Sequence, residues 1–101
     1  MKNFRTIEFI NGSEVTLTIR PGGLVVNFGG RTEEGYDYTT LEYRIEENEA
    51  GETILVCYED NSVCDCDGPL NRSYVRESSD GKHWKTLRRE QQDVYAESMG
   101  Y

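Results

Sequence analysis

Residues 40–58 read TLEYRIEENEAGETILVCY, and this stretch decides the fold. Its first arm, residues 40–46, alternates apolar and polar side chains, which is the pattern of a half-buried strand in an antiparallel sheet. Its second arm, residues 53–58, carries apolar side chains on both faces, which is typical of a central strand covered on both sides. The two arms therefore predict a β-hairpin at the centre of a sheet.

The loop between the two arms sets their register. We predict a four-residue loop over residues 48–51, because it aligns apolar residues on one face. The resulting pairs are Leu41 with Tyr58, Tyr43 with Val56 and Ile45 with Ile54. Leu55 and Cys57 then lie on the other face of the second arm, so another element must cover them.

Alternation and turn signals predict further strands on either side of this hairpin. The full set covers about residues 4–10, 13–20, 24–28, 39–46, 53–58, 73–78 and 82–87, and the segments 29–38 and 60–72 read as loops. In the first hairpin a two-residue turn would place Glu8 opposite Val15, which mixes polar and core positions. We therefore predict a three-residue loop, Ile10–Gly12, which aligns Ile7 and Phe9 with the apolar residues of the next strand.

Residues 88–98 contain no Pro or Gly and are rich in Arg, Glu and Gln, so we predict a C-terminal helix there. This helix, or alternatively a second subunit in a homodimer, would cover Leu55 and Cys57. The predicted fold class is α+β. It is a single domain, residues 1–101, with a β-rich antiparallel sheet of five to seven strands built from hairpins and one C-terminal helix.

The acidic residues are concentrated in one part of the chain. Residues 31–67 hold twelve of the nineteen acidic residues and only two of the eleven basic ones, so this window carries −10 while the whole chain carries −8. Such a balance disfavours direct contact with nucleic-acid phosphates or anionic membranes. The N-terminus has no apolar signal-peptide region, and three cysteines suit a reducing compartment, so we expect a cytoplasmic protein.

One set of residues has the chemistry of a zinc site. Cys57, Cys64, Cys66 and His83 are types that bind zinc tetrahedrally. Their spacing, Cys-x6-Cys-x-Cys-x16-His, lacks the paired close cysteines of common zinc motifs. The alternative is a core cysteine, two loop thiols and a solvated histidine. We expect no cofactor, and a small zinc-stabilised binding module is the second interpretation of the chain.

No catalytic motif accompanies these residues. His83 is the only histidine, and no nucleophile turn of the Gly-x-Ser-x-Gly type is present. The glycines match neither the phosphate-binding loop nor the dinucleotide pattern. We therefore expect no enzymatic activity, and an enzyme that uses carboxylates and His83 is the third interpretation.

The acidic window favours a binding function, with a solvated face that only maintains solubility as the alternative. Carboxylates on regular strands can imitate phosphates and occupy a basic surface of another protein, such as one that binds nucleic acid. In size, charge and compactness alone the chain resembles phage-encoded inhibitors of bacterial defence, including DNA mimics and some anti-CRISPR proteins. The residues that we expect to contact the partner are Glu33, Glu34, Tyr36, Asp37, Tyr38, Glu42, Glu46, Glu47, Glu49 and Glu52.

Overall fold

The structure is a computed structural model, and it describes residues 2–32, 35–65 and 68–93. Within these ranges the chain forms seven β-strands and no helix. The strands are β1 (Phe4–Ile10), β2 (Ser13–Ile19), β3 (Leu24–Thr32), β4 (Gly35–Glu47), β5 (Thr53–Asp65), β6 (Gly68–Ser78) and β7 (Lys85–Asp93). No part of these ranges forms a helix long and apolar enough to cross a membrane.

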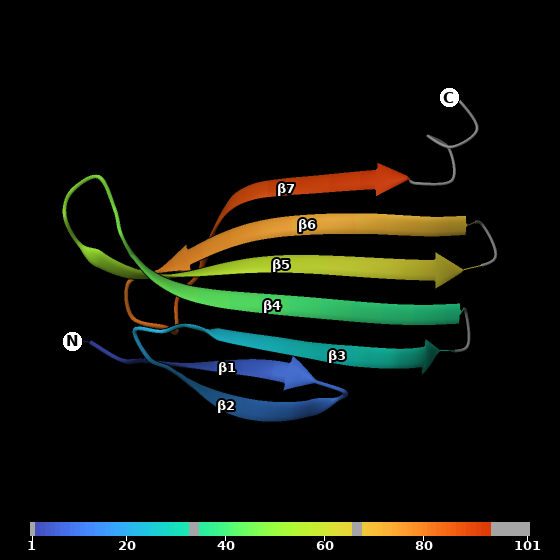
Figure 1. Ribbon diagram of the computed structural model, residues 1–101, viewed down its shortest axis with the longest axis horizontal. Helices are drawn as coiled ribbons and strands as arrows, with labels where there is room; N and C mark the ends of the chain where they lie inside the picture. Colours follow the sequence, from blue (N-terminus) through green and yellow to red (C-terminus); the bar gives the residue numbers. More distant parts are fainter. Residues whose placement is uncertain (1, 33–34, 66–67, 94–101) are drawn as a thin grey trace.

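The strands form two antiparallel sheets. Strands β3 to β7 pair in chain order as a five-stranded meander, and β1 pairs only with β2 as a separate hairpin (Figure 1). The central strand is β5, where four consecutive residues, Ile54–Cys57, are at most 6% exposed. The prediction of a buried central strand is confirmed, and among the described residues the covering element lies on one face only.

The register predicted for the β4–β5 hairpin is wrong by one residue. Glu47 pairs with Thr53, so the connection has five residues, 48–52, instead of four. The Asn48 side chain explains the extra residue, because its Oδ1 accepts hydrogen bonds from the backbone N–H groups of Ala50 and Glu52. Gly51 has φ of 79° and completes the turn.

This shift exchanges the two faces of β5. Tyr43 now pairs with Cys57 and Ile45 with Leu55, so these four residues share what we call the inner face of the sheet. Ile54, Val56 and Tyr58 lie instead on the opposite, outer face. On that face they are joined by alternate residues of β4, which are Glu42, Arg44 and Glu46.

The register predicted for the first hairpin is also wrong. Asn11 and Gly12 have φ of 52° and 81°, which is the geometry of a two-residue type I′ turn, and Ile10 pairs directly with Ser13. Glu8 therefore lies opposite Val15, on the side of the hairpin that packs against the sheet. Ile7 and Phe9 face solvent with 54% and 70% of their surface exposed.

The β1–β2 hairpin provides the cover over the inner face that we had assigned to a helix or a second subunit. Its buried residues Phe4 and Ile19 pack in one cluster with side chains of β4 and β5. The other buried members of this cluster are Leu41, Tyr43, Leu55 and Cys57. The hydrophobic core thus lies between the hairpin and the inner face of the sheet.

Strands β3 to β6 are longer than the sequence predicts, and the described residues of the segments 29–38 and 60–72 are mostly strand. Strand β7 begins at Lys85, three residues later than the predicted strand over residues 82–87. Residues 88–93, predicted to be helical, belong to β7 and pair with β6. Their Arg and Gln residues favour a helix only weakly, and pairing with a neighbouring strand overrides that preference. Residues 94–98 of the predicted helix lie outside the described ranges.

The connection between β6 and β7, residues 79–84, reaches across to β1 (Figure 1). It is shaped by Asp80, whose Oδ1 accepts hydrogen bonds from the backbone N–H groups of Lys82 and His83. Gly81 is buried, has φ of 80°, and lies so close to the Arg5 backbone that a Cβ atom would overlap the Arg5 carbonyl oxygen. A glycine at this position therefore lets the connection pack on β1.

We expect a graded loss of stability in three glycine-to-alanine variants. Gly81→Ala adds both a strained φ and a backbone clash, and should lower the free energy of unfolding by about 2–4 kcal/mol. Gly12→Ala adds strain alone and should lower it by about 1 kcal/mol. Gly22→Ala is the control, because nothing lies within 4 Å of its Cβ position. Urea unfolding measures all three, and equal losses in the first two would contradict the packing of Gly81 on β1.

Candidate functional site

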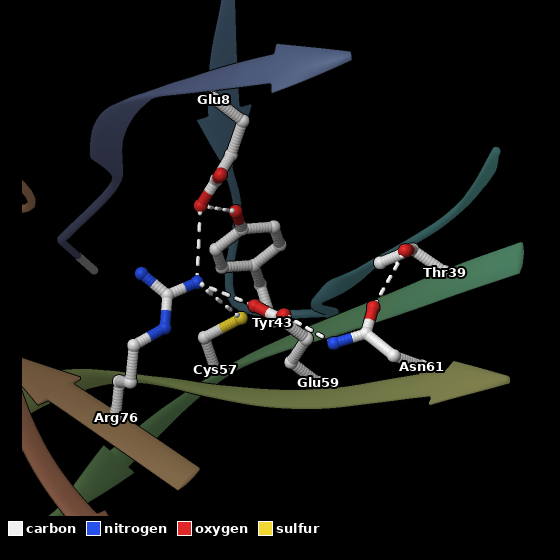
Figure 2. A network of polar contacts seen from close by, with 7 residues as sticks. All are labelled: Glu8, Thr39, Tyr43, Cys57, Glu59, Asn61 and Arg76. Carbon is white, nitrogen blue, oxygen red and sulfur yellow. Dashed lines mark hydrogen bonds and ion pairs between the residues drawn. The ribbon is translucent and has the colours of Figure 1, made fainter. Parts of the chain in front are cut away.

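A network of polar side chains joins the β1–β2 hairpin to the inner face of the sheet (Figure 2). Glu8 of β1 makes two of its contacts: its Oε1 accepts a hydrogen bond from the Tyr43 hydroxyl at 2.7 Å and an ion-paired one from Arg76 Nη2 at 3.1 Å. Glu8 and Arg76 are 18% and 21% exposed. This is why a glutamate is tolerated on the packed side of the hairpin.

The same guanidinium also contacts β5. Arg76 Nη2 lies 3.3 Å from Glu59 Oε1 and 3.5 Å from the Cys57 Sγ. Glu59 in turn accepts a hydrogen bond from the Asn61 amide, whose oxygen accepts one from Thr39 (Figure 2). Four strands, β1, β4, β5 and β6, are therefore linked by one set of polar contacts.

Aromatic contacts complete the surroundings of Arg76. Its guanidinium carbon lies 4.9 Å from the centroid of the Trp84 ring, which is a cation–π geometry. Trp84 also contacts Tyr43, with ring centroids 6.3 Å apart. Trp84 is the last residue of the β6–β7 connection, which packs on β1. Its contact with Arg76 therefore links this connection to the polar network between the hairpin and the sheet.

The network holds its thiol and its phenol in the protonated form. Burial raises the pKa of Cys57 to about 11, although the neighbouring Arg76 opposes this shift. Burial, followed by the hydrogen bond to Glu8, raises the pKa of Tyr43 well above its ordinary value. A thiol and a phenol that stay protonated at neutral pH are poor nucleophiles. The arrangement therefore suits the joining of strands better than covalent chemistry.

The predicted zinc ligands are only partly described. Cys57 lies in the core beside Arg76, whereas His83 is 89% exposed and its Nδ1 lies 2.6 Å from Asp80 Oδ2. The side chains of Cys64 and Cys66 are outside the described part of the structure. Among the side chains that are described, no three His, Cys, Asp or Glu residues come together to hold a metal. The zinc site stays a prediction.

The predicted partner-binding residues fall in separate places. Glu33, Glu34 and the Tyr36 side chain lie outside the described part. Asp37 and Tyr38 are exposed on β4, but they stand nine or more residues from Glu47, which is roughly 30 Å along an extended strand. The described residues of the predicted set therefore do not form one continuous surface.

The densest acidic group is at the end of the β4–β5 hairpin. Glu46, Glu47, Glu49 and Glu52 fall within seven residues, and residues 45–53 contain no Lys or Arg. Three of the four are exposed, and Glu46 is half-buried where it accepts a hydrogen bond from the Tyr58 hydroxyl at 3.0 Å. We call these four glutamates the acidic tip.

Glu42 behaves differently, although it belongs to the same strand. Its Oε1 lies 2.7 Å from Arg44 Nη2, two residues along the same face. The opposite charges of Glu42 and Arg44 therefore offset each other. The guanidinium carbon of Arg44 also lies 5.0 Å from the centroid of the Tyr58 ring. Glu42 therefore contributes less to the negative field than the acidic tip does.

A groove beside the acidic tip was missed by the sequence analysis. It lies on the outer face, has a volume of about 600 Å³, and is lined by residues of the β4–β5 end together with β5, β6 and Leu87. The predicted register assigned Ile54 and Val56 to the core face, so the sequence analysis placed no apolar floor there. The signal that points to it is Asn48, whose side chain lengthens the loop by one residue.

We expect Arg76 to contribute far more stability than Arg44, although both are paired with glutamates. Arg76→Met leaves Glu8 and Glu59 partly buried without a cation, and should lower the free energy of unfolding by about 2–4 kcal/mol. Arg44→Met is the matched control and should change it little, because the exposed Arg44–Glu42 pair is screened by water. Urea unfolding at neutral pH measures both variants. If Arg76→Met lowers the free energy of unfolding no more than Arg44→Met does, the contacts of Arg76 in the inner-face network do not stabilise the fold as proposed.

We expect Cys57 to be unreactive in the folded protein. In a Cys64→Ser/Cys66→Ser variant, Ellman's reagent at pH 8 should find no thiol until guanidinium is added, because Cys57 is fully buried and its pKa is raised to about 11. Since this pKa exceeds the ordinary value of 9.0, rising pH deprotonates the unfolded state first and should lower the free energy of unfolding between those values. Rapid labelling of the native variant would contradict this placement of Cys57.

Comparison with known proteins gives no assignment, because no protein-family model, curated protein or solved structure matches the chain. The function is therefore inferred from the acidic tip, the groove and the inner-face network.

Proposed function

We propose that the protein is a small non-catalytic binding protein whose acidic tip engages a basic surface of a partner protein. The observation that carries the proposal is the concentration of four glutamates at the end of one hairpin, in a segment without Lys or Arg. Where this basic surface is the nucleic-acid-binding surface of the partner, its occupation by this protein would inhibit nucleic-acid binding.

The geometry of the acidic tip supports this role. Glu47, Glu49 and Glu52 are exposed, and the loop that carries two of them is held by hydrogen bonds to Asn48. Charges on a fixed loop keep their spacing when a partner approaches, so less conformational entropy is lost on binding. Electrostatic attraction of this kind acts chiefly on the rate of association.

The inner-face network supports a role without catalysis. Cys57 and Tyr43 are held protonated there, and Arg76 is occupied by two carboxylates. His83 is exposed on a connection and paired with Asp80. These four side chains are thus engaged in contacts within the fold.

We expect charge reversal at the acidic tip to slow association with the partner. The partner is captured from a lysate of the source cells at low salt, identified by mass spectrometry and purified, and its binding is followed by surface plasmon resonance. Glu49→Lys should reduce the association rate constant by about threefold to tenfold, and raised salt should reduce it further.

Glu14→Lys is the matched control, because Glu14 is exposed beside the β1–β2 turn, which points away from the β4–β5 connection (Figure 1). This control should leave the rate close to that of the unmodified protein. When the nucleic acid that the partner binds is added, it should compete with this protein for the same basic surface of the partner. An association rate that neither Glu49→Lys nor salt alters would overturn the proposed function.

A further inference from the structure

The groove on the outer face has an apolar floor next to the acidic tip. Ile54 and Val56 of β5, which are 6% and 4% exposed, lie at its base, and the half-buried Val75 of β6 lies beside them. The register explains this grouping, because Val56 pairs with Glu77 and Tyr58 with Val75, which places all of these residues on one face. A charged hairpin end thus adjoins an apolar hollow.

Leu87 of β7 forms a wall of this groove, and an irregularity of the sheet places it there. Val75 pairs with Arg88 and Arg76 pairs with Thr86, so Leu87 is an extra residue without a partner in the register. A bulge of this kind redirects a side chain and bends the strand. Leu87 remains 50% exposed, so an apolar surface at the edge of the groove is available for contact.

The rim of the groove is acidic. Glu46, Glu47 and Glu49 of the acidic tip line one side, and Glu77 of β6 lines another. No Lys or Arg is among the residues that line it. An occupant must therefore combine an apolar group, which fills the hollow, with positive charge, which meets the rim.

We propose that this groove binds a short segment of a partner protein in which an apolar side chain is flanked by Lys or Arg. This proposal rests on the proposed function and refines it. It adds an apolar contact in the groove to the electrostatic contact between the acidic tip and a basic surface. The apolar side chain contacts Leu87 and the floor, and the flanking cations face Glu46, Glu49 and Glu77. A second copy of this chain fits less well, because each copy carries a net charge of −8.

The test uses a random peptide library displayed on phage and selected against the immobilised full chain. The expected result is enrichment of peptides with an apolar residue between basic ones. An enriched peptide is then synthesised with a fluorescent label, and its dissociation constant is measured by anisotropy. Leu87→Ser should weaken its binding by roughly tenfold, since an apolar anchor is lost.

Ile7→Ser is the matched control for Leu87→Ser. Ile7 is 54% exposed, close to the 50% of Leu87, and it lies on the far side of the β1–β2 hairpin from the sheet. This variant should bind the peptide as the unmodified chain does. Circular dichroism of both variants tests whether each is folded. If Leu87→Ser does not fold, Leu87→Ala removes most of the same side chain without adding a hydroxyl and takes its place in the binding measurement.

The possible outcomes separate this proposal from the proposed function. Cationic peptides that bind equally to the unmodified chain and to Leu87→Ser, but not to Glu49→Lys, would overturn the groove and leave the acidic tip as the binding surface. Enrichment of peptides without basic residues would overturn the groove proposal and also argue against the proposed function. Self-association that Leu87→Ser abolishes, measured by sedimentation, would assign the groove to a second copy and overturn the peptide proposal.

Discussion

The fold depends on one guanidinium, that of Arg76, held between two carboxylates. Glu8 comes from the hairpin that covers the sheet and Glu59 from the central strand, and the two would repel each other across the packed interface without the cation. An apolar interface alone fixes a hairpin position only loosely, since one hydrophobic contact can replace another. The directed contacts of Glu8 with Arg76 and Tyr43 select one position and one register.

The same contacts explain how much of the fold could be predicted from sequence. Alternation and turn residues located the first two strands within one residue and identified the central strand, because these signals are local. The register of the β4–β5 hairpin failed because the Asn48 side chain lengthens its loop, and that of the first hairpin failed because apolar alternation was weighed above the Asn11–Gly12 turn. Glu8 reads as a misplaced polar residue unless its partner 68 residues away is known. Likewise, nothing in the helix preference of residues 88–93 indicates that β6 is there to pair with them.

The candidate site shows the same division. The concentration of glutamates at residues 46–52 is visible in the sequence, and the structure places it at one end of a rigid hairpin. The groove beside the acidic tip could not be predicted from the sequence, because it arises from two shifts in strand pairing, each by one residue. Asn48 shifts β5 so that Ile54 and Val56 turn outward, and the bulge at Leu87 brings a third strand into the same surface.

The order of the strands has a consequence for how the chain folds. Strands β3 to β7 follow one another in space as they do in sequence, so each new strand closes only a short loop and loses little chain entropy. The contacts between β1 and the segment from Arg76 to Gly81 are the exception, since Glu8 and Arg76 are 68 positions apart and Arg5 and Gly81 are 76 positions apart. The largest entropic barrier therefore falls on the docking of the N-terminal hairpin, and the polar contacts that fix its position form at that same step.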